Sequence, residues 1–147
     1  MVRSPDEETV LALYAAGGAG DWNAAAALVT PDFTLREPEC FPFGGTYLGI
    51  AALRAFYTVI FEAAGPTDMD LNAATSGDGH VTVLVTLRMR DHGVTADVVE
   101  AFRMEDGKIA AITVYYLDPP RVASVYAGVA DAIASRFPDV QRLPAGL

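Results

Sequence analysis

The second half of the chain has a regular pattern of apolar residues and turn glycines that strongly restricts its fold. From about Met69 to Asp118, apolar and polar residues alternate with a period of two. Three glycine-containing turns interrupt this pattern, at Ser76-Gly77-Asp78-Gly79, Asp91-His92-Gly93 and Glu105-Asp106-Gly107. Each turn supplies a glycine where a hairpin needs a positive φ angle. The pattern predicts four successive antiparallel strands.

Two short helices are expected before any strand. Ser4 is an N-cap candidate that is followed by a proline and, three residues later, by a glutamate, and this pattern predicts a helix over residues 5–16. A glycine-rich run at 17–20 ends that helix, and Asp21 then caps a second helix over 22–29. We expect these two helices to pack as an antiparallel pair.

A first strand and a third helix follow. A turn at 30–32 precedes a predicted strand over 33–37, which Pro38 ends. A phenylalanine-containing loop at 39–45 then leads to a short strand at 46–48. Apolar residues recur at helical spacing from Ile50 to Ile60, which predicts the third helix.

The element order indicates an α+β fold. We expect a cone-shaped open barrel, in which a strongly curved and mainly antiparallel sheet wraps around the three helices of the N-terminal half. The sequence Asp118-Pro119-Pro120 starts a further, C-terminal helix that carries an apolar face and ends near Phe137. A length of 147 residues suits one domain. We assign 1–118 to the cone and 119–147 to a helical extension of the same domain.

Composition narrows the function classes. The chain has 19 Asp and Glu against 10 Lys and Arg, for a net charge of −9, so that nucleic acid and anionic membranes are poor partners. No segment approaches the roughly 20 apolar residues of a membrane span, and no signal peptide is recognisable, which predicts a cytoplasmic protein. Cys40 is the only cysteine, and no metal-ligand or phosphate-loop spacing occurs. We therefore expect no metal and no cofactor.

One carboxylate stands out in the strand that runs from Val94 to Met104. One face of this strand is apolar except for Glu100, the members of this face being Ala96, Val98, Glu100, Phe102 and Met104. A buried carboxyl without a partner escapes its desolvation cost by a raised pKa, and a neutral acid can donate a hydrogen bond to an oxyanion. The alternative is an ion pair between Glu100 and Arg88 or Arg90 on the neighbouring strand.

A second carboxylate shares the apolar side of the sheet. Glu37 has the same parity as Phe33 and Leu35, so it points inward unless it is a solvated charge at the strand end. Two carboxyls in one apolar cone would form an acid/base pair. In the last strand, Tyr116 belongs to the apolar layer, as core or as site residue, and Asp118 lies at its rim.

These segments resemble ketosteroid isomerase. The stretch from Asp21 to Pro38 is similar in spacing, and the resemblance places Glu37 at the general-base position of that family. The stretch from Val99 to Met104 resembles the strand whose protonated acid donates to the substrate oxyanion, a role that falls on Glu100. Tyr57 matches a tyrosine that supports this network. The main oxyanion tyrosine of the family falls on Leu13, with Tyr14 one residue further and about 100° round the helix.

The loop after Pro38 looks more like the broad SnoaL-like group of the nuclear transport factor 2-like superfamily, which includes polyketide cyclases. The resemblance implies a small-molecule acid/base enzyme that acts on a hydrophobic, carbonyl-containing substrate without a cofactor. The expected catalytic residues are Glu37, Glu100, Tyr57 and Tyr14, with Glu37 moving the proton. The expected substrate-binding residues are Leu13, Phe41, Phe43, Phe56, Val98, Phe102, Ile112, Tyr116 and Asp118.

Two other functions remain open at this stage. The chain could be a polyketide cyclase, or it could bind a hydrophobic ligand or a second copy without turnover. The outward side of the sheet, which includes Thr95, Val99 and Ala101, predicts a homodimer through this face.

Overall fold

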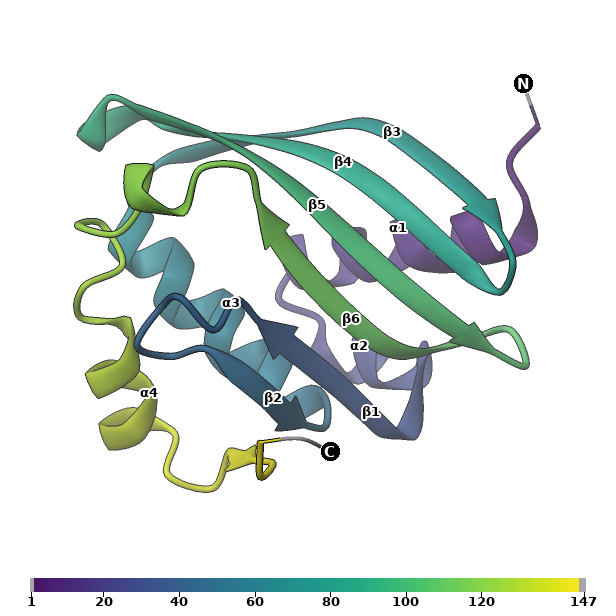
Figure 1. The fold of residues 1–147 in the computed structure, drawn as a ribbon. Helices are drawn as coiled ribbons and strands as arrows, with labels where there is room; N and C mark the ends of the chain where they lie inside the picture. Colours follow the sequence, from purple (N-terminus) through teal and green to yellow (C-terminus); the bar gives the residue numbers. More distant parts are fainter. Residues whose placement is uncertain (1, 146–147) are drawn as a thin grey trace.

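The computed structural model describes residues 2–145 and shows an α+β fold, with a curved, unclosed sheet that wraps around helices (Figure 1). The helices are α1 (Pro5–Gly18), α2 (Trp22–Ala27), α3 (Ile50–Ala64) and α4 (Val129–Arg136). The strands are β1 (Val29–Glu37), β2 (Gly45–Leu48), β3 (Thr67–Gly77), β4 (His80–Met89), β5 (Val94–Glu105), β6 (Lys108–Tyr116) and β7 (Gln141–Arg142). The expected fold class is confirmed.

The seven strands form one sheet in the order β3-β4-β5-β6-β1-β2-β7. The pairing of β1 with β6 is parallel, and every other pairing in this sheet is antiparallel. The run from β3 to β6 is the four-stranded antiparallel meander that the turn glycines predict. At two of its turns, Asp78 and Asp106 also adopt a positive φ of 51°, directly before the glycine.

The predicted caps of the first two helices are confirmed. The Ser4 hydroxyl accepts a hydrogen bond from the backbone N–H of Glu7 at 3.1 Å, and the Asp21 carboxylate accepts one from Ala24 at 3.0 Å. Both caps satisfy amides that the helix itself leaves unpaired. Helix α1 extends through Gly18, two residues beyond the predicted end.

Three further predicted boundaries are wrong. Helix α2 ends at Ala27, two residues before its predicted end. Strand β1 begins at Val29, and the expected turn at 30–32 is an irregular part of this strand, where the register with β6 shifts. The C-terminal helix covers only Val129–Arg136. The residues before it form successive turns, because hydrogen bonds spanning three residues, such as Val129 to Tyr126, interrupt the helical ladder. The apolar spacing alone could not distinguish these turns from a helix.

The core lies between the concave face of the sheet and the helices α1, α2 and α3 (Figure 1). Strand β4 shows the alternation most clearly, since Val81, Val83, Val85, Leu87 and Met89 are buried. Between them lie residues that face the convex side of the sheet. The concave face is therefore the dry side, and any polar group on it lies in an apolar environment.

The loop between β1 and β2 is tightly folded directly after Glu37. The Phe41 N–H donates to Pro38 O, and the Gly44 N–H donates to Phe41 O. The hydroxyl of Tyr47 donates to Phe43 O at 2.8 Å. A Cβ atom at Gly44 would lie 2.3 Å from Pro38 O, so only glycine fits there. The loop thus fixes the end of β1, where Glu37 lies.

Gly44→Ala is therefore expected to lower the free energy of unfolding by about 3 kcal/mol, because the clashing atoms belong to the backbone and cannot rotate away. The matched control is Gly128→Ala. No heavy atom lies within 4 Å of a Cβ built at Gly128, and its φ of −93° suits alanine. Urea unfolding of both variants measures the difference. Equal midpoints for the two variants would contradict this account of the loop.

Candidate active site

The predicted carboxyl pair lies on the concave face of the sheet. In the ladder between β5 and β6, Glu100 lies opposite Val114. On the other side of β6, the parallel ladder pairs Arg36 with Thr113, so that the next residues, Glu37 and Val114, are also neighbours. The two glutamates thus flank Val114 from either side of β6. Both side chains line the same interior cavity.

Helix α1 contributes the hydrogen-bond donor of the site. The hydroxyl of Tyr14 donates to Glu100 Oε1 at 2.6 Å, and the Tyr14 ring packs edge-on against Phe102. Burial, and next the charge of Glu100, raise the pKa of Tyr14 far above its usual range, so Tyr14 keeps its proton. Leu13, one residue earlier, is buried and lines the cavity beside it. Both residues of the Leu13 and Tyr14 pair thus face the interior.

Glu37 is a buried carboxyl that lacks a full set of hydrogen-bond partners. Its side chain is buried, with 5% of the residue exposed, and its Oε2 atom has no hydrogen-bond partner. Burial, and next the charge of Glu100, raise the pKa of Glu37 from 4.5 to about 8. A carboxyl in this position holds its proton at neutral pH, because the ionised form would be left without solvent or a counter-ion.

Glu100 lies in the same environment but has a partner. Burial raises its pKa, and the hydrogen bond from Tyr14 opposes this shift by stabilising the carboxylate. The alternative of an ion pair with arginine is wrong. Arg88 pairs with Asp70 and Arg90 pairs with Asp68, all on exposed side chains.

Two adjoining cavities surround Glu100. The inner cavity, of about 90 Å³, lies between the carboxyl pair and α3. The outer cavity, of about 100 Å³, lies between Glu100, α1 and α3. Glu100 and Tyr57 line both. None of the described residues that line either cavity is Lys, Arg or His. The site can therefore exchange protons through carboxyls and tyrosines only.

Tyr57 borders both cavities, but its hydroxyl has no hydrogen bond to Glu100. Its ring instead packs against Trp22 and Phe61, at 5.6 and 4.6 Å between centroids. The structure thus places Tyr57 as an aromatic wall of the site. Its hydroxyl remains available to a bound molecule.

Most of the predicted substrate-binding residues line a cavity. Leu13, Phe102 and Ile112 border the outer cavity, whereas Phe56, Val98 and Tyr116 border the inner one. The other three predicted residues line neither of these cavities. Phe41 and Phe43 stack on each other at 5.0 Å in an aromatic cluster behind the site. Asp118 is exposed and pairs with Arg121, because it lies beyond the end of β6.

Sequence reasoning missed several lining residues. Trp22, Leu53, Phe61 and Met69 border the outer cavity. Leu53 belongs to the apolar face of α3 and could have been found by helical spacing. Trp22 and Met69 carry no such signal, because they reach the cavity through the packing of α2 and β3 and not through their own periodicity.

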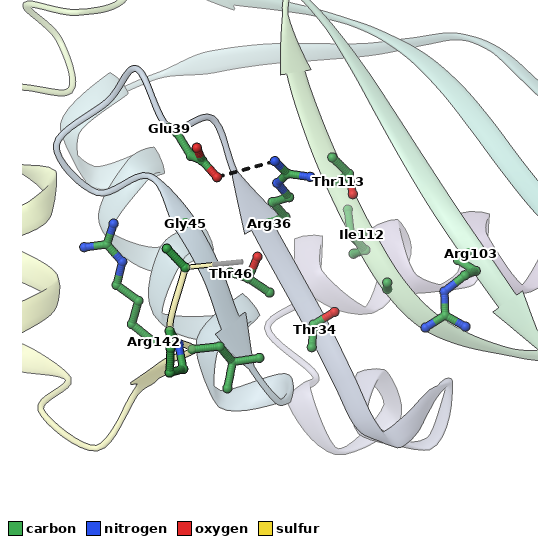
Figure 2. Close-up of a pocket in the computed structure, with 13 residues that line it drawn as sticks. Thr34, Arg36, Glu39, Gly45, Thr46, Arg103, Ile112, Thr113 and Arg142 are labelled. Carbon is green, nitrogen blue, oxygen red and sulfur yellow. Dashed lines mark hydrogen bonds and ion pairs between the residues drawn. The ribbon is translucent and has the colours of Figure 1, made fainter. Parts of the chain in front are cut away.

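A larger hollow of about 920 Å³ lies on the convex side of the sheet (Figure 2). It is lined by Arg36, Arg103 and Arg142 together with several threonines. Figure 2 shows Arg36 directed toward Glu39, with which it forms an ion pair at 3.4 Å. This hollow contains none of the buried carboxyls. We place the chemistry in the interior, where the titratable groups are perturbed.

No group of three or more His, Cys, Asp or Glu residues within 2–145 could hold a metal ion. Within the same residues, no helix has both the length and the apolarity that crossing a membrane requires.

Comparison with known proteins identifies the family of this chain. The model of the SnoaL-like domain matches residues 10–112, which is more than half of the chain. The chain belongs to the SnoaL-like family. Among curated proteins, none matches its sequence. The family assignment thus rests on the domain model and on the fold.

Solved structures show the same fold as this SnoaL-like protein. TerC, crystallised with polyporic acid, is 25% identical, with a TM-score of 0.71 over 84% of this chain and 99% of TerC. An NTF2-like protein from Burkholderia xenovorans is 24% identical, with a TM-score of 0.65 over 85% of this chain and 98% of the other. A proposed polyketide cyclase from Sinorhizobium meliloti is 17% identical, with a TM-score of 0.61 over 74% and 94%.

The raised pKa of Glu37 predicts an unusual pH dependence of stability. The folded state holds a proton that the unfolded state loses near pH 4.5, so stability is full below that pH and declines until about pH 8. The expected loss is on the order of several kcal/mol. Carboxyls with a lowered pKa, such as Glu62, titrate below pH 4.5 and therefore do not contribute to this decline.

Urea unfolding at pH 5 and pH 8.5 measures this decline. Glu37→Gln is expected to make it shallower, since glutamine does not titrate. The control is Glu39→Gln, which removes an exposed carboxyl two residues away. A decline in Glu37→Gln as steep as that of the unsubstituted protein would show that Glu37 is not the responsible group.

Proposed function

We propose that this SnoaL-like protein is an acid/base enzyme that moves a proton on a hydrophobic, carbonyl-containing substrate. One observation carries the proposal. Two carboxyls face one apolar interior with no cation among its lining residues, and only one of them receives a hydrogen bond from the protein. Such an arrangement separates the proton affinities of the two groups, which acid/base catalysis near neutral pH requires.

The hydrogen bond from Tyr14 indicates which of the two glutamates carries a proton at neutral pH. It stabilises the carboxylate of Glu100, whereas nothing in the described chain donates to the unpartnered oxygen of Glu37. The charge of Glu100 further raises the pKa of Glu37. We therefore propose Glu100 as the base and Glu37 as the acid, the reverse of the allocation that the resemblance to ketosteroid isomerase implies.

The reaction follows from this allocation. The Glu100 carboxylate takes a proton from the carbon next to the carbonyl, and the C–H electron pair moves into a new C=C bond. Glu37 gives its proton to the carbonyl oxygen, which yields an enol. With a β,γ-unsaturated carbonyl substrate the enol is a dienol. Glu100 then returns its proton to the γ carbon, the double bond shifts to the α,β position, and the enol O–H gives its proton back to Glu37 as the carbonyl re-forms. The apolar walls exclude water, which would otherwise reduce the difference in pKa between the two carboxyls.

Hydrogen–deuterium exchange tests the proposal. Acetophenone in D₂O exchanges its methyl hydrogens on enolisation, and NMR measures the rate. Glu100→Gln is expected to slow the catalysed exchange about a hundredfold, because it removes the base. Glu37→Gln should cost only about tenfold, since the amide still donates, whereas Glu37→Val removes the donor and should cost about a hundredfold.

The pH profile and a control complete this test. The rate should fall above about pH 8, where Glu37 loses its proton. Glu39→Gln should leave the rate unchanged. If Glu37→Gln is the slower glutamine variant, the two roles are exchanged. If neither glutamate matters, the proton-transfer function is wrong and the chain binds its ligand without turnover.

A polyketide cyclase is the second candidate. It is favoured by the family assignment and by the TerC structure, whose crystals contained polyporic acid. A cyclase would use the same carboxyl pair to form an enol that attacks a second carbonyl. Products with a new C–C bond, detected by mass spectrometry from a polyketide-like chain, would favour this reaction over an isomerisation.

We also propose that the convex side of the sheet forms a homodimer. Strand registers place Leu84 opposite Val99 and Val99 opposite Tyr115, so these side chains form one row across three strands. Leu84 is 44% exposed and Tyr115 is 56% exposed. An apolar row in this position is typical of a surface that a second copy covers.

Light scattering over a range of concentrations measures the oligomeric state. Tyr115→Asp is expected to shift a dimer toward monomer, because it places a charge in the apolar row, whereas Tyr115→Phe should retain the dimer. A protein that is monomeric at every concentration would contradict the dimer.

A further inference from the structure

Tyr126 lies behind a residue that lines the inner cavity, although no part of the predicted site includes it. Its residue is only 1% exposed, and its hydroxyl lies 2.9 Å from the hydroxyl of Tyr116. Tyr116 in turn lines the inner cavity beside the carboxyl pair. Tyr126 therefore backs the wall that a substrate would touch.

Packing holds Tyr126 firmly in this position. Its ring packs edge-on against Phe41 at 5.8 Å and against Phe43 at 6.1 Å. Val122 and Val129, on either side in the chain, are fully buried. Helix α4 lies against α3 (Figure 1). An ion pair joins Arg136 of α4 to Glu62 of α3. The wall thus cannot retreat without loss of several contacts.

This wall comes from outside the matched domain. The SnoaL-like domain model ends at residue 112, before Tyr116 and Tyr126. Residues 113–145 thus lie beyond the match to the domain model, and this part of the chain supplies a side chain directly behind the site. A side chain in this position can limit the size of the substrate.

Both cavities are small compared with ligand pockets in other proteins. Typical ligand pockets measure roughly 300–1,000 Å³. A cavity of about 150 Å³ is known to hold one benzene molecule. The inner and outer cavities, at about 90 and 100 Å³, together hold one ring with a short substituent.

The charges that line the site also restrict which ligands can bind. Two carboxyls and no lining cation disfavour an anionic ligand, because its carboxylate would meet like charge in a dry interior. A neutral ketone can instead accept a hydrogen bond from a protonated carboxyl. The apolar rings around it supply the remaining contacts.

We propose that Tyr126 is a specificity-determining residue, which acts through Tyr116 and restricts the site to neutral carbonyl compounds of a single ring. The C-terminal segment thus supports one wall of the inner cavity through Tyr116, without lining the cavity itself. This inference rests on the proposed function for the carbonyl, whereas the size limit depends only on the geometry of the cavity and its wall.

Equilibrium dialysis against three probes tests the inference. Acetophenone is the single-ring ketone, 2-acetylnaphthalene adds a second ring, and benzoate is the anion of similar shape to acetophenone. The unsubstituted protein is expected to bind acetophenone at least tenfold more tightly than either of the other two. Binding of 2-acetylnaphthalene or benzoate with equal affinity would overturn the proposal.

Variants of Tyr126 connect the selection to this residue. Tyr126→Ala should lower the preference for acetophenone over 2-acetylnaphthalene at least tenfold, because Tyr116 gains room to move back. Tyr126→Phe should retain the preference, since it keeps the ring. Val129→Ala removes buried volume from the same segment without touching Tyr116, and it should also retain the preference. An unchanged preference in Tyr126→Ala would overturn the proposal.

Two measurements distinguish a change in ligand preference from loss of folding and from loss of catalysis. Circular dichroism confirms that each variant is folded, and Tyr126→Leu replaces Tyr126→Ala if the latter unfolds. Dialysis measures binding alone, so a shifted preference supports the size limit even where deuterium exchange fails. Failure of the exchange with an intact size preference would therefore count against the proposed function and not against the role of Tyr126.

Discussion

The site depends on placing two carboxyls in an interior whose lining residues, within 2–145, include no positive charge. A buried carboxylate is costly unless it is paired or hydrogen-bonded. The hydroxyl of Tyr14 meets this need for Glu100, and Glu37 meets it by retaining its proton. One interaction between helix α1 and strand β5 thereby makes two chemically similar side chains different. The proposed division into base and acid follows from this difference.

The curved sheet makes that interaction possible. Glu37 and Glu100 belong to strands on either side of β6, and their shared neighbour Val114 places them on one face. A flat sheet would direct them in parallel, whereas the curvature turns them toward a common interior. The helices α1 and α3 then close that interior with aromatic and aliphatic side chains. Burial raises the pKa values because this enclosure excludes water.

Much of the fold and part of the site could be predicted from local patterns. The parity of Glu37 and Glu100 in their strands, together with the turn glycines, was enough to predict both the meander and the inward carboxyls. Parity did not show that Asp118 lies outside both cavities, because it does not show where a strand ends and solvent begins. It also gave no position for Phe41 and Phe43, whose rings stack on each other outside both cavities. The position of Tyr126 could not be predicted from local patterns, because Phe41 and Phe43, which it contacts, are far from it in the sequence.

The sequence by itself determined which residues face inward, since alternation along a strand and periodicity along a helix are local properties of the chain. It therefore determined the sheet, the helices on its concave face and the presence of acids among apolar residues. Only the tertiary structure decided which acid has a donor, how large the cavities are and which segment closes them. These properties depend on contacts between α1, the central strands and the C-terminal segment. Residues that lie 86 positions apart, such as Tyr14 and Glu100, meet only when the whole chain is folded.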